Sequence, residues 1–328
     1  MKMSKIRLCA AALALTLLAG CAVGAEREQR ENFVEQTALE EVCIEEELVA
    51  LAGAPALSTL LLPEASGTKV SKNQKATIDY SNIQDGYVMV NFTADSDKRL
   101  KTKVIGPGTE YTYDIKDQTW TTFPLADGNG EYTVKVYEQN PATGKYAVVG
   151  KVTFNVELKD EFAPFLRPNQ YVDYAEAVNT LAKAKELTEG LTDPLQKVEK
   201  VYDFVVGHLT YDKELAKNVQ SGYLPVLDDV LAKGKGICFD YAALMTAMLR
   251  SQGVPCKLVT GYVGTAKPAY HAWISVWSKE TGWVDGAIYF DGSVWQRMDP
   301  TFASSGSGDE SIMEYIGDGN NYVVKYFY

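Results

Sequence analysis

Between residues 68 and 157, hydrophobic and polar residues alternate along short segments rich in Val, Thr and Tyr. Alternation with a period of two is typical of strands that bury one face. Turn sequences such as Asp85-Gly86 and Asn140-Pro141-Ala142-Thr143-Gly144 separate the segments at the spacing expected of a β-sandwich. The pattern predicts strands over Ala76–Tyr80, Tyr87–Ala94, Leu100–Ile105, Glu110–Ile115, Glu131–Glu138 and Val148–Val156.

The length of this region and its turn spacing are typical of an immunoglobulin-like sandwich. It contains no histidine or cysteine, and its acidic residues alternate with apolar ones as solvent-facing positions do. We therefore expect a spacer or an interaction module. Contact with carbohydrate, a cell wall or a surface protein through Tyr111, Tyr113 or Trp120 is the alternative, although aromatic residues in strands usually pack.

From residue 158 onward, apolar residues recur first at helical spacing and then alternate again. Thr192-Asp193-Pro194 is a helix-start signal, because it joins a capping residue to an early proline. A helical half followed by a sheet half predicts an α+β domain over 158–328. The predicted helices are Tyr174–Leu187, Leu195–Leu209, Val226–Leu231 and Cys238–Leu249, and the predicted strands are Cys256–Val263, Ala269–Trp277, Gly282–Asp285, Val294–Asp299 and Tyr322–Phe327.

The N-terminus has the pattern of an export signal. Three basic residues precede an apolar run over 8–18, which is too short to span a bilayer as a stable helix. The end of this run, Leu18-Ala19-Gly20-Cys21, resembles a bacterial lipobox, which implies cleavage before Cys21 and a lipid on that cysteine. The alternative is an ordinary secretory signal cut near Ala25. We expect an exported protein anchored by its lipid outside the cytoplasmic membrane.

Residues 21–67 read as an acidic helical tether. Nine glutamates lie between Glu26 and Glu47, and Pro63-Glu64-Ala65-Ser66-Gly67 has the composition of a linker. The predicted organisation is therefore a signal peptide over 1–20, a tether over 21–67, a sandwich over 68–157 and an α+β domain over 158–328.

Composition excludes some partners. The chain of 328 residues is 46% hydrophobic and 23% charged, which is ordinary for a globular protein. Removing residues 1–20 takes away three basic residues and no acidic one, so the formal net charge goes from −11 to −14. Nucleic acid is therefore not an expected partner.

Of the five cysteines, Cys9 lies in the signal and Cys21 is the predicted lipid site. The chain has no Cys-x-x-Cys sequence and no Cys/His cluster, so we expect no structural zinc site, and we predict no cofactor. Cys256 opens a predicted strand after Gly253-Val254-Pro255, which favours a buried apolar role. A disulfide from Cys43 to Cys256 has no positive support in the sequence.

Cys238 is the candidate nucleophile. It follows Gly234-Lys235-Gly236-Ile237 and begins a predicted apolar helix. Unpaired N–H groups and the positive end of the helix dipole favour a thiolate at that position, and the thiolate is the reactive species. Asp240 in the same turn opposes the thiolate, so a base is needed.

Only two histidines are present. His208 ends a predicted helix, where a cation complements the dipole. His271 lies in a predicted strand downstream of the helix-start cysteine, which is the order found in Cys/His/Asp hydrolases. Asp299 and Asp285, each at the end of an apolar strand, are candidates for the group that orients the imidazole.

Four blocks follow one another along the chain: Val230–Leu244, Gly253–Cys256 with Val259–Tyr262, His271-Ala272-Trp273, and Met298–Phe302. Together they resemble the transglutaminase-like superfamily over about residues 190–302. The resemblance implies a papain-like α+β fold in which Cys238 is the nucleophile, His271 the base and Asp299 the orienting carboxylate. An insertion over 286–293 departs from the family pattern and keeps Asp285 as an alternative.

These residues predict acyl transfer through a thioester on Cys238, with a protein or peptide as substrate. Water as acceptor would make the protein a cysteine peptidase or amidase, and a lysine amine would make it a cross-linking transglutaminase. We expect hydrolysis, because the sequence contains no acidic metal loop of the EF-hand type and no recognised amine-donor site. The alternative from another class is a non-catalytic surface lipoprotein, since a fold does not imply activity.

Overall fold

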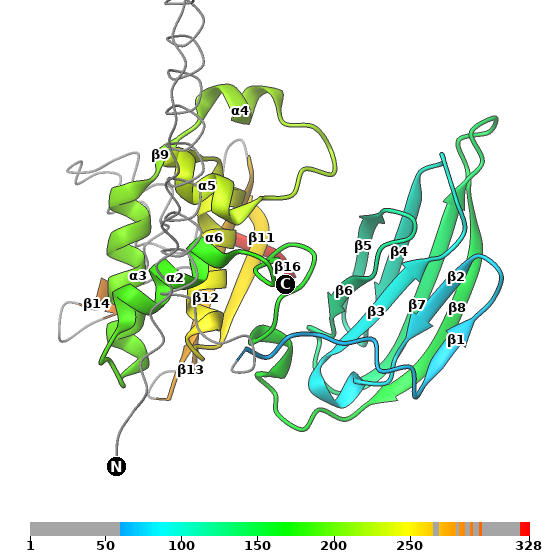
Figure 1. Ribbon diagram of the computed structural model, residues 1–328, viewed down its shortest axis with the longest axis horizontal. Coiled ribbons are helices and arrows are strands. Elements are labelled where there is room, and N and C mark those ends of the chain that lie inside the picture. Colours follow the sequence, from blue (N-terminus) through cyan, green and yellow to red (C-terminus); the bar gives the residue numbers. More distant parts are fainter. Residues whose placement is uncertain (1–59, 265–268, 280–281, 286–288, 291–294, 297–321) are drawn as a thin grey trace, which may run out of the picture. The chain divides into compact units, whose positions relative to one another are not determined.

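A computed structural model describes residues 60–264, 269–279, 282–285, 289–290, 295–296 and 322–328 (Figure 1). They belong to one compact unit, Ala50–Tyr328. The predicted signal peptide, Cys21 and most of the predicted tether lie outside the described residues. Within these ranges, none of the helices combines the length and apolar character needed to cross a membrane.

Residues 70–156 form two antiparallel sheets of four strands each (Figure 1). All six predicted strands are present, and the structure adds two that the pattern missed. One sheet has the order β1 (Val70–Lys72), β2 (Ala76–Asp79), β3 (Tyr87–Phe92), β6 (Thr121–Pro124). The other has the order β5 (Glu110–Ile115), β4 (Leu100–Ile105), β7 (Gly130–Gln139), β8 (Tyr146–Val156).

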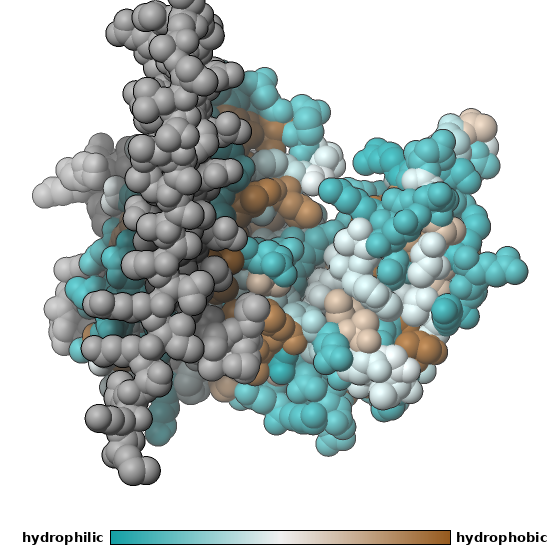
Figure 2. Space-filling view, viewed as in Figure 1, coloured by the Kyte–Doolittle hydropathy of each residue, from teal (hydrophilic) through white to brown (hydrophobic). Residues whose placement is uncertain are grey.

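The missed strands β1 and β6 are short and stand at sheet edges, where pairing on one side suffices and alternation is weak. The predicted alternation is confirmed in β4, whose residues Leu100, Thr102 and Val104 are buried while their neighbours are not. In Figure 2 the visible surface over these sheets is mostly hydrophilic. The immunoglobulin-like class of the sheets and the domain boundaries stay predictions.

Tyr111 and Tyr113 are core residues, each 1% exposed. Their rings lie 5.8 and 5.9 Å from the ring of Tyr328, the last residue of the sequence. Trp120, by contrast, is 40% exposed. Of the three aromatic residues considered for binding, only Trp120 therefore presents its side chain to solvent.

The second half contains helices followed by a four-stranded antiparallel sheet of order β13-β12-β11-β16. Asp193 caps α3 as predicted, since its carboxylate accepts a hydrogen bond from the Leu195 N–H at 2.9 Å. The helix α4 was not predicted, because its six residues bury none of their side chains. The helices are α2 (Val178–Thr188), α3 (Pro194–His208), α4 (Lys213–Asn218), α5 (Leu227–Lys233) and α6 (Cys238–Ser251), and the strands are β11 (Cys256–Val263), β12 (Ala269–Ser278), β13 (Gly282–Asp285) and β16 (Tyr322–Phe327).

Two short strand pairs and two 3-10 turns complete the description of these residues. A parallel pair joins β9 (Thr210–Tyr211) to β10 (Lys235–Gly236). An antiparallel pair joins β14 (Tyr289–Phe290) to β15 (Trp295–Gln296). The other residues of the strand predicted over 294–299 lie outside the described residues. Short 3-10 turns cover Ile83–Asp85 and Ala163–Phe165.

Helix α6 is the centre of this half of the chain. All eleven residues from Asp240 to Arg250 are buried, because α2, α3 and α5 contact the helix in addition to β11 and β12 (Figure 1). The sequence predicted one apolar face, whereas the structure buries the helix all round. Small side chains at Ala242, Ala243 and Ala247 leave room for the surrounding elements to approach.

At the end of α6, the buried guanidinium of Arg250 joins three distant segments. It donates hydrogen bonds to the main-chain oxygens of Arg167, Cys256 and Tyr328 at 2.8, 2.8 and 2.5 Å. Burial lowers the pKa of this guanidinium, so the hydrogen bonds to carbonyl oxygens compensate for its lost hydration. Arg250 thus holds the start of β11, and Tyr328 directly after β16, against the end of α6.

Candidate active site

The segment that leads into Cys238 is held at both of its ends. Gly234 ends α5 in the left-handed conformation, with φ of 60°, and its N–H donates to the Val230 carbonyl at 3.1 Å. The next two residues form β10, which pairs with Thr210–Tyr211 directly after α3. Cys238 then begins α6, where the sequence predicted a helix start.

Asp240 shapes the first turn of α6 rather than standing free beside the thiol. Its carboxylate accepts hydrogen bonds from the Ile237 N–H and from the Tyr223 hydroxyl, both at 2.7 Å. Burial raises the pKa of Asp240, and these two hydrogen bonds oppose the shift. Asp240 therefore satisfies the N–H that precedes Cys238, which is one of the unpaired donors of a helix start.

Gly236 permits this turn. A Cβ atom at position 236 would lie 2.5 Å from the Cβ of Asp240 and 2.8 Å from its Oδ2, closer than real atoms approach. Asp240 approaches so closely that position 236, two residues before Cys238, has to be a glycine.

We predict that Gly236→Ala lowers the free energy of unfolding by about 1–3 kcal/mol through overpacking, and that it alters the alkylation rate of Cys238. Urea unfolding and thiol labelling measure the two effects. Gly207→Ala in α3 is the matched control, because nothing lies within 4 Å of the Cβ position there and alanine favours a helix. Equal stability of the two variants would contradict the contact with Asp240.

The two described cysteines have opposite environments. Cys238 is half-buried and Cys256 is fully buried, and both are free thiols. Cys256 lies 3.6 Å from the Thr246 hydroxyl, inside the core under α6. Burial raises its pKa from the ordinary 9.0 to about 11. This confirms the apolar interpretation of Cys256, whose thiol is free, while Cys43 lies outside the described residues.

The raised pKa of Cys256 predicts a loss of stability in alkali. As the pH rises from 9 towards 11, the unfolded chain releases the thiol proton while the folded protein keeps it, so the free energy of unfolding falls. The expected loss is at most about 2.7 kcal/mol over this window. Urea unfolding of the native protein and of Cys256→Ala at several pH values tests it, because the variant should lack this part of the slope. Parallel pH profiles would refute the assignment.

His271 lies in β12, opposite Gly261 of β11, and is 8% exposed. Its ring is 6.3 Å from the ring of Trp273. A side chain at Gly261 could not fit, since its Cβ would lie 2.8 Å from the Trp273 ring and 2.1 Å from the Val323 carbonyl oxygen. The missing side chain at position 261 thus lets Trp273 and the backbone of β16 pack closely beside the strand segment that carries His271.

Cys238 and His271 lie towards the same end of a packed helix–strand pair. Helix α6 contacts β12, and both run in the same direction: Thr246 of α6 contacts Cys256, which pairs with Val276 near the far end of β12. Their starts, with Cys238 and His271, are therefore on the same side. The pairing of the two side chains as nucleophile and base stays a prediction.

The third candidate position stays open. Asp299 lies outside the described residues. Asp285 is the last residue of β13, where its backbone pairs with Ser275 of β12. The choice between these two aspartates is therefore unchanged from the sequence.

His208 has the structural role that its helix-end position predicted. It is the last residue of α3, its Nε2 lies 2.6 Å from the Leu231 carbonyl oxygen, and its ring stacks on Phe204 with centroids 4.9 Å apart. These contacts connect the ends of α3 and α5.

Tyr223 is a site residue that the sequence did not reveal. It lies between α4 and α5, where no periodic pattern marks it, and it reaches Asp240 across 17 positions of sequence. Beside it is a cavity of about 410 Å³. Two ion pairs line this cavity, Asp212 with Lys235 at 3.1 Å and Asp229 with Lys233 at 3.0 Å.

Comparison with known proteins identifies this half of the chain. Residues 181–300 match the sequence profile of the transglutaminase-like superfamily. This region is a transglutaminase-like domain. It contains both Cys238 and His271, and it extends to Asp299. A transglutaminase-like fold is typically that of a cysteine-dependent enzyme.

Among curated relatives, an uncharacterized protein of Mycobacterium tuberculosis is 26% identical over 157 residues, which cover 44% of this chain and 46% of the relative. A protein-glutamine gamma-glutamyltransferase of Pseudomonas aeruginosa is 36% identical over 112 residues, which cover 30% of this chain and 16% of that protein. The chain thus spans about half the length of the mycobacterial relative and a smaller part of the other. Both similarities are partial.

Among solved structures, a protein of Cytophaga hutchinsonii that is provisionally named a cysteine protease aligns with a TM-score of 0.37 and 14% identity, covering 80% of this chain and 74% of that one. Red sea bream transglutaminase aligns with a TM-score of 0.27 and 15% identity, covering 66% of this chain and 48% of that one.

Proposed function

We propose that the chain is a thiol enzyme that acts on peptide or carboxamide bonds through an acyl-enzyme on Cys238. His271 would hold the thiol proton, the thiolate would attack the carbonyl carbon, and His271 would return the proton to the departing amine. Asp299 would orient the imidazole, with Asp285 as the alternative. Water would then release the acid, which makes the enzyme a cysteine peptidase or amidase.

The position of Cys238 carries the proposal. Cys238 is a free, half-buried thiol and the first residue of α6, where unpaired helix-start N–H groups gather. Asp240, the acidic residue in the same turn, already accepts hydrogen bonds from Ile237 and Tyr223. The fully buried Cys256 offers no comparable nucleophile.

Alkylation with iodoacetamide near neutral pH tests the thiol. We expect Cys238 to react much faster than Cys256, and His271→Ala to slow the reaction of Cys238. Peptide mapping by mass spectrometry assigns the label to each cysteine. Two results would contradict a catalytic thiol and favour a non-catalytic surface protein. One is equal alkylation rates at the two cysteines, and the other is an alkylation rate at Cys238 that His271→Ala leaves unchanged.

The acyl acceptor needs a separate experiment. The protein is incubated with a peptide library, with and without an added primary amine, and the products are weighed by mass spectrometry. Chain cleavage or deamidation supports the proposed hydrolase. Incorporation of the amine in preference to water would instead support the alternative, a protein-crosslinking transglutaminase.

We further propose export and lipid anchoring at Cys21, on the basis of the lipobox-like sequence Leu18-Ala19-Gly20-Cys21. The native chain should fractionate with bacterial membranes and carry lipid on Cys21. Cys21→Ser should lose the lipid. A native N-terminus near Ala25 without lipid would replace this proposal by ordinary secretion.

For the N-terminal sheets we propose an immunoglobulin-like sandwich that serves as a spacer or interaction module. Its support is the pair of four-stranded antiparallel sheets and the strict alternation in strands such as β4.

A further inference from the structure

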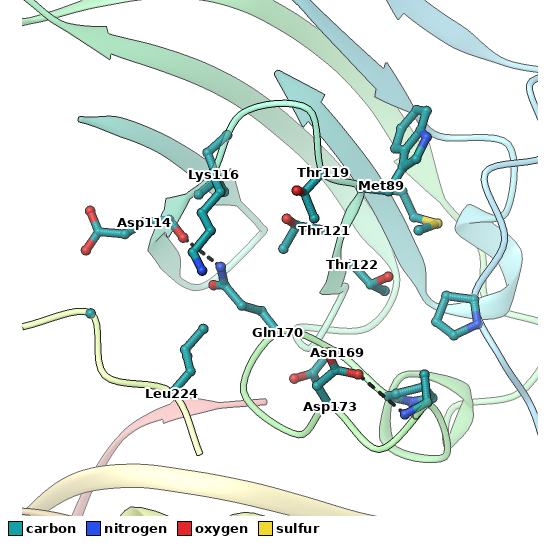
Figure 3. Close-up of a pocket in the computed structure, with 16 residues that line it drawn as sticks. Met89, Asp114, Lys116, Thr119, Thr121, Thr122, Asn169, Gln170, Asp173 and Leu224 are labelled. Carbon is teal, nitrogen blue, oxygen red and sulfur yellow. Dashed lines mark hydrogen bonds between the residues drawn. The ribbon is translucent and has the colours of Figure 1, made fainter. Parts of the chain in front are cut away.

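A cavity of about 460 Å³ opens beside β5 and β6 (Figure 3). This volume falls within the range of pockets that hold small ligands. The loop from β5 to β6 forms one wall, the segment 168–175 forms another, and Gly222 and Leu224 contribute from the loop before α5. We call it the Trp120 pocket.

Trp120 gives this pocket an apolar surface. Its indole is 40% exposed, whereas the described Trp273 is 1% exposed. A tryptophan usually buries most of its large ring, so an exposed indole on the wall of a pocket is a candidate contact for a ligand. Met89 and Ile115 extend the apolar wall.

The pocket does not accept an added peptide strand easily. Gln170 takes one main-chain acceptor on each of the two neighbouring sheet edges. Its N–H donates to the Thr122 carbonyl of β6 at 3.1 Å, and its side-chain amide donates to the Asp114 carbonyl of β5 at 2.6 Å (Figure 3). Strand addition needs free backbone groups along such an edge. Recognition in this pocket therefore falls mainly to side chains.

Those side chains offer both donors and acceptors. Asn169 is 5% exposed, and its Oδ1 accepts from the N–H groups of Tyr171 and Val172. This fixes the amide, whose Nδ2 has no hydrogen-bond partner among the described residues. The Nδ2 atom is itself closed off from solvent, so the amide helps to shape the wall and is not a donor that a ligand reaches.

An acceptor faces the same pocket. Asp173 is an exposed residue, and its carboxylate accepts a hydrogen bond from the Ala175 N–H at 3.4 Å. The hydroxyls of Thr119, Thr121 and Thr122 can both donate and accept. A fitting ligand therefore has an apolar face bordered by groups that donate and accept at once.

We propose that the Trp120 pocket binds an oligosaccharide. A pyranose ring presents an apolar face of C–H groups that can stack on the indole, and its hydroxyls can donate to Asp173 and hydrogen-bond with the threonine hydroxyls. A peptide could use the same wall, but Gln170 already takes one carbonyl acceptor on each sheet edge. This inference concerns binding alone and does not depend on the chemistry proposed for Cys238.

Binding is tested with the full chain carrying Cys238→Ala, so that no turnover interferes. A broad glycan array identifies candidates, and isothermal titration with the best oligosaccharide gives its Kd. We expect Trp120→Ala to raise the Kd by at least about tenfold, and Trp120→Phe to retain part of the affinity by keeping a ring. Tyr262→Ala is the matched control, because Tyr262 is a similarly exposed aromatic residue, 38%, on β11; its Kd should stay within about twofold.

Three results would overturn the proposal. The first is that the protein binds no saccharide although its circular dichroism shows that it is folded. Another is a glycan affinity that Trp120→Ala leaves unchanged. The third is a pool of peptides that binds in a Trp120-dependent way when no saccharide does, which would assign the pocket to peptides.

Discussion

Replacing Cys238 by alanine should reduce turnover of any peptide or carboxamide substrate by a factor on the order of 10⁴ or more, because the proposed acyl-enzyme forms on the Cys238 sulfur. The expected covalent intermediate is a thioester on the Cys238 sulfur. Rates measured under single-turnover conditions and the intact mass of the quenched protein test both statements. The native protein should show the mass of the enzyme plus the acyl group, and the variant should not.

Cys256→Ala is the matched control for this experiment. It removes the other described thiol, which is buried in the core and does not belong to the site. We expect turnover to change little once the variant is shown to be folded, although the lost packing costs some stability. Activity that survives Cys238→Ala but falls with Cys256→Ala would reverse the assignment of the nucleophile.

Replacing Arg250 by methionine should lower the free energy of unfolding by about 3 kcal/mol or more. Methionine fills much of the same space but donates no hydrogen bond, so the main-chain oxygens of Arg167, Cys256 and Tyr328 lose a charged donor in a buried setting. Urea unfolding at neutral pH measures the loss.

The matched control is Lys185→Met, which removes a cation from an exposed position near the end of α2. A change within about 0.5 kcal/mol is expected there. A similarly small change at Arg250 would show that its three hydrogen bonds are replaceable, and that β16 docks without them.

The docking of β16 illustrates a limit of sequence reasoning. The strand itself was predicted over Tyr322–Phe327 and is confirmed. Its partner was not predictable, because β16 pairs with β11 far earlier in the chain, for example at Val259↔Phe327. Lys257 of β11 contributes to this contact, with its ammonium 4.6 Å from the centre of the Phe327 ring. Pairing between distant strands leaves no mark on the local pattern of either one.

Burial of α6 shows the same limit in a helix. The periodic apolar residues predicted a helix from Cys238, but only one buried face. Asp240, Thr246 and Arg250 are buried as well, and each has found a partner from another part of the chain: Tyr223, Cys256 and the three carbonyls. The sequence around a polar residue does not show which distant segment will supply its hydrogen-bond partner.

The sequence by itself determined the local elements, since strand and helix periods, glycine turns and caps act over a few residues. It determined that Cys238 begins a helix and that His271 lies in a strand. The tertiary structure decided which side chains are buried and which hydrogen bonds they make. Cys256, Tyr111 and Tyr113 are buried in the core, whereas Trp120 stays exposed. Tyr223 and Ile237 donate hydrogen bonds to the Asp240 carboxylate. The physical reason is that burial and hydrogen bonding depend on segments that only folding brings into contact.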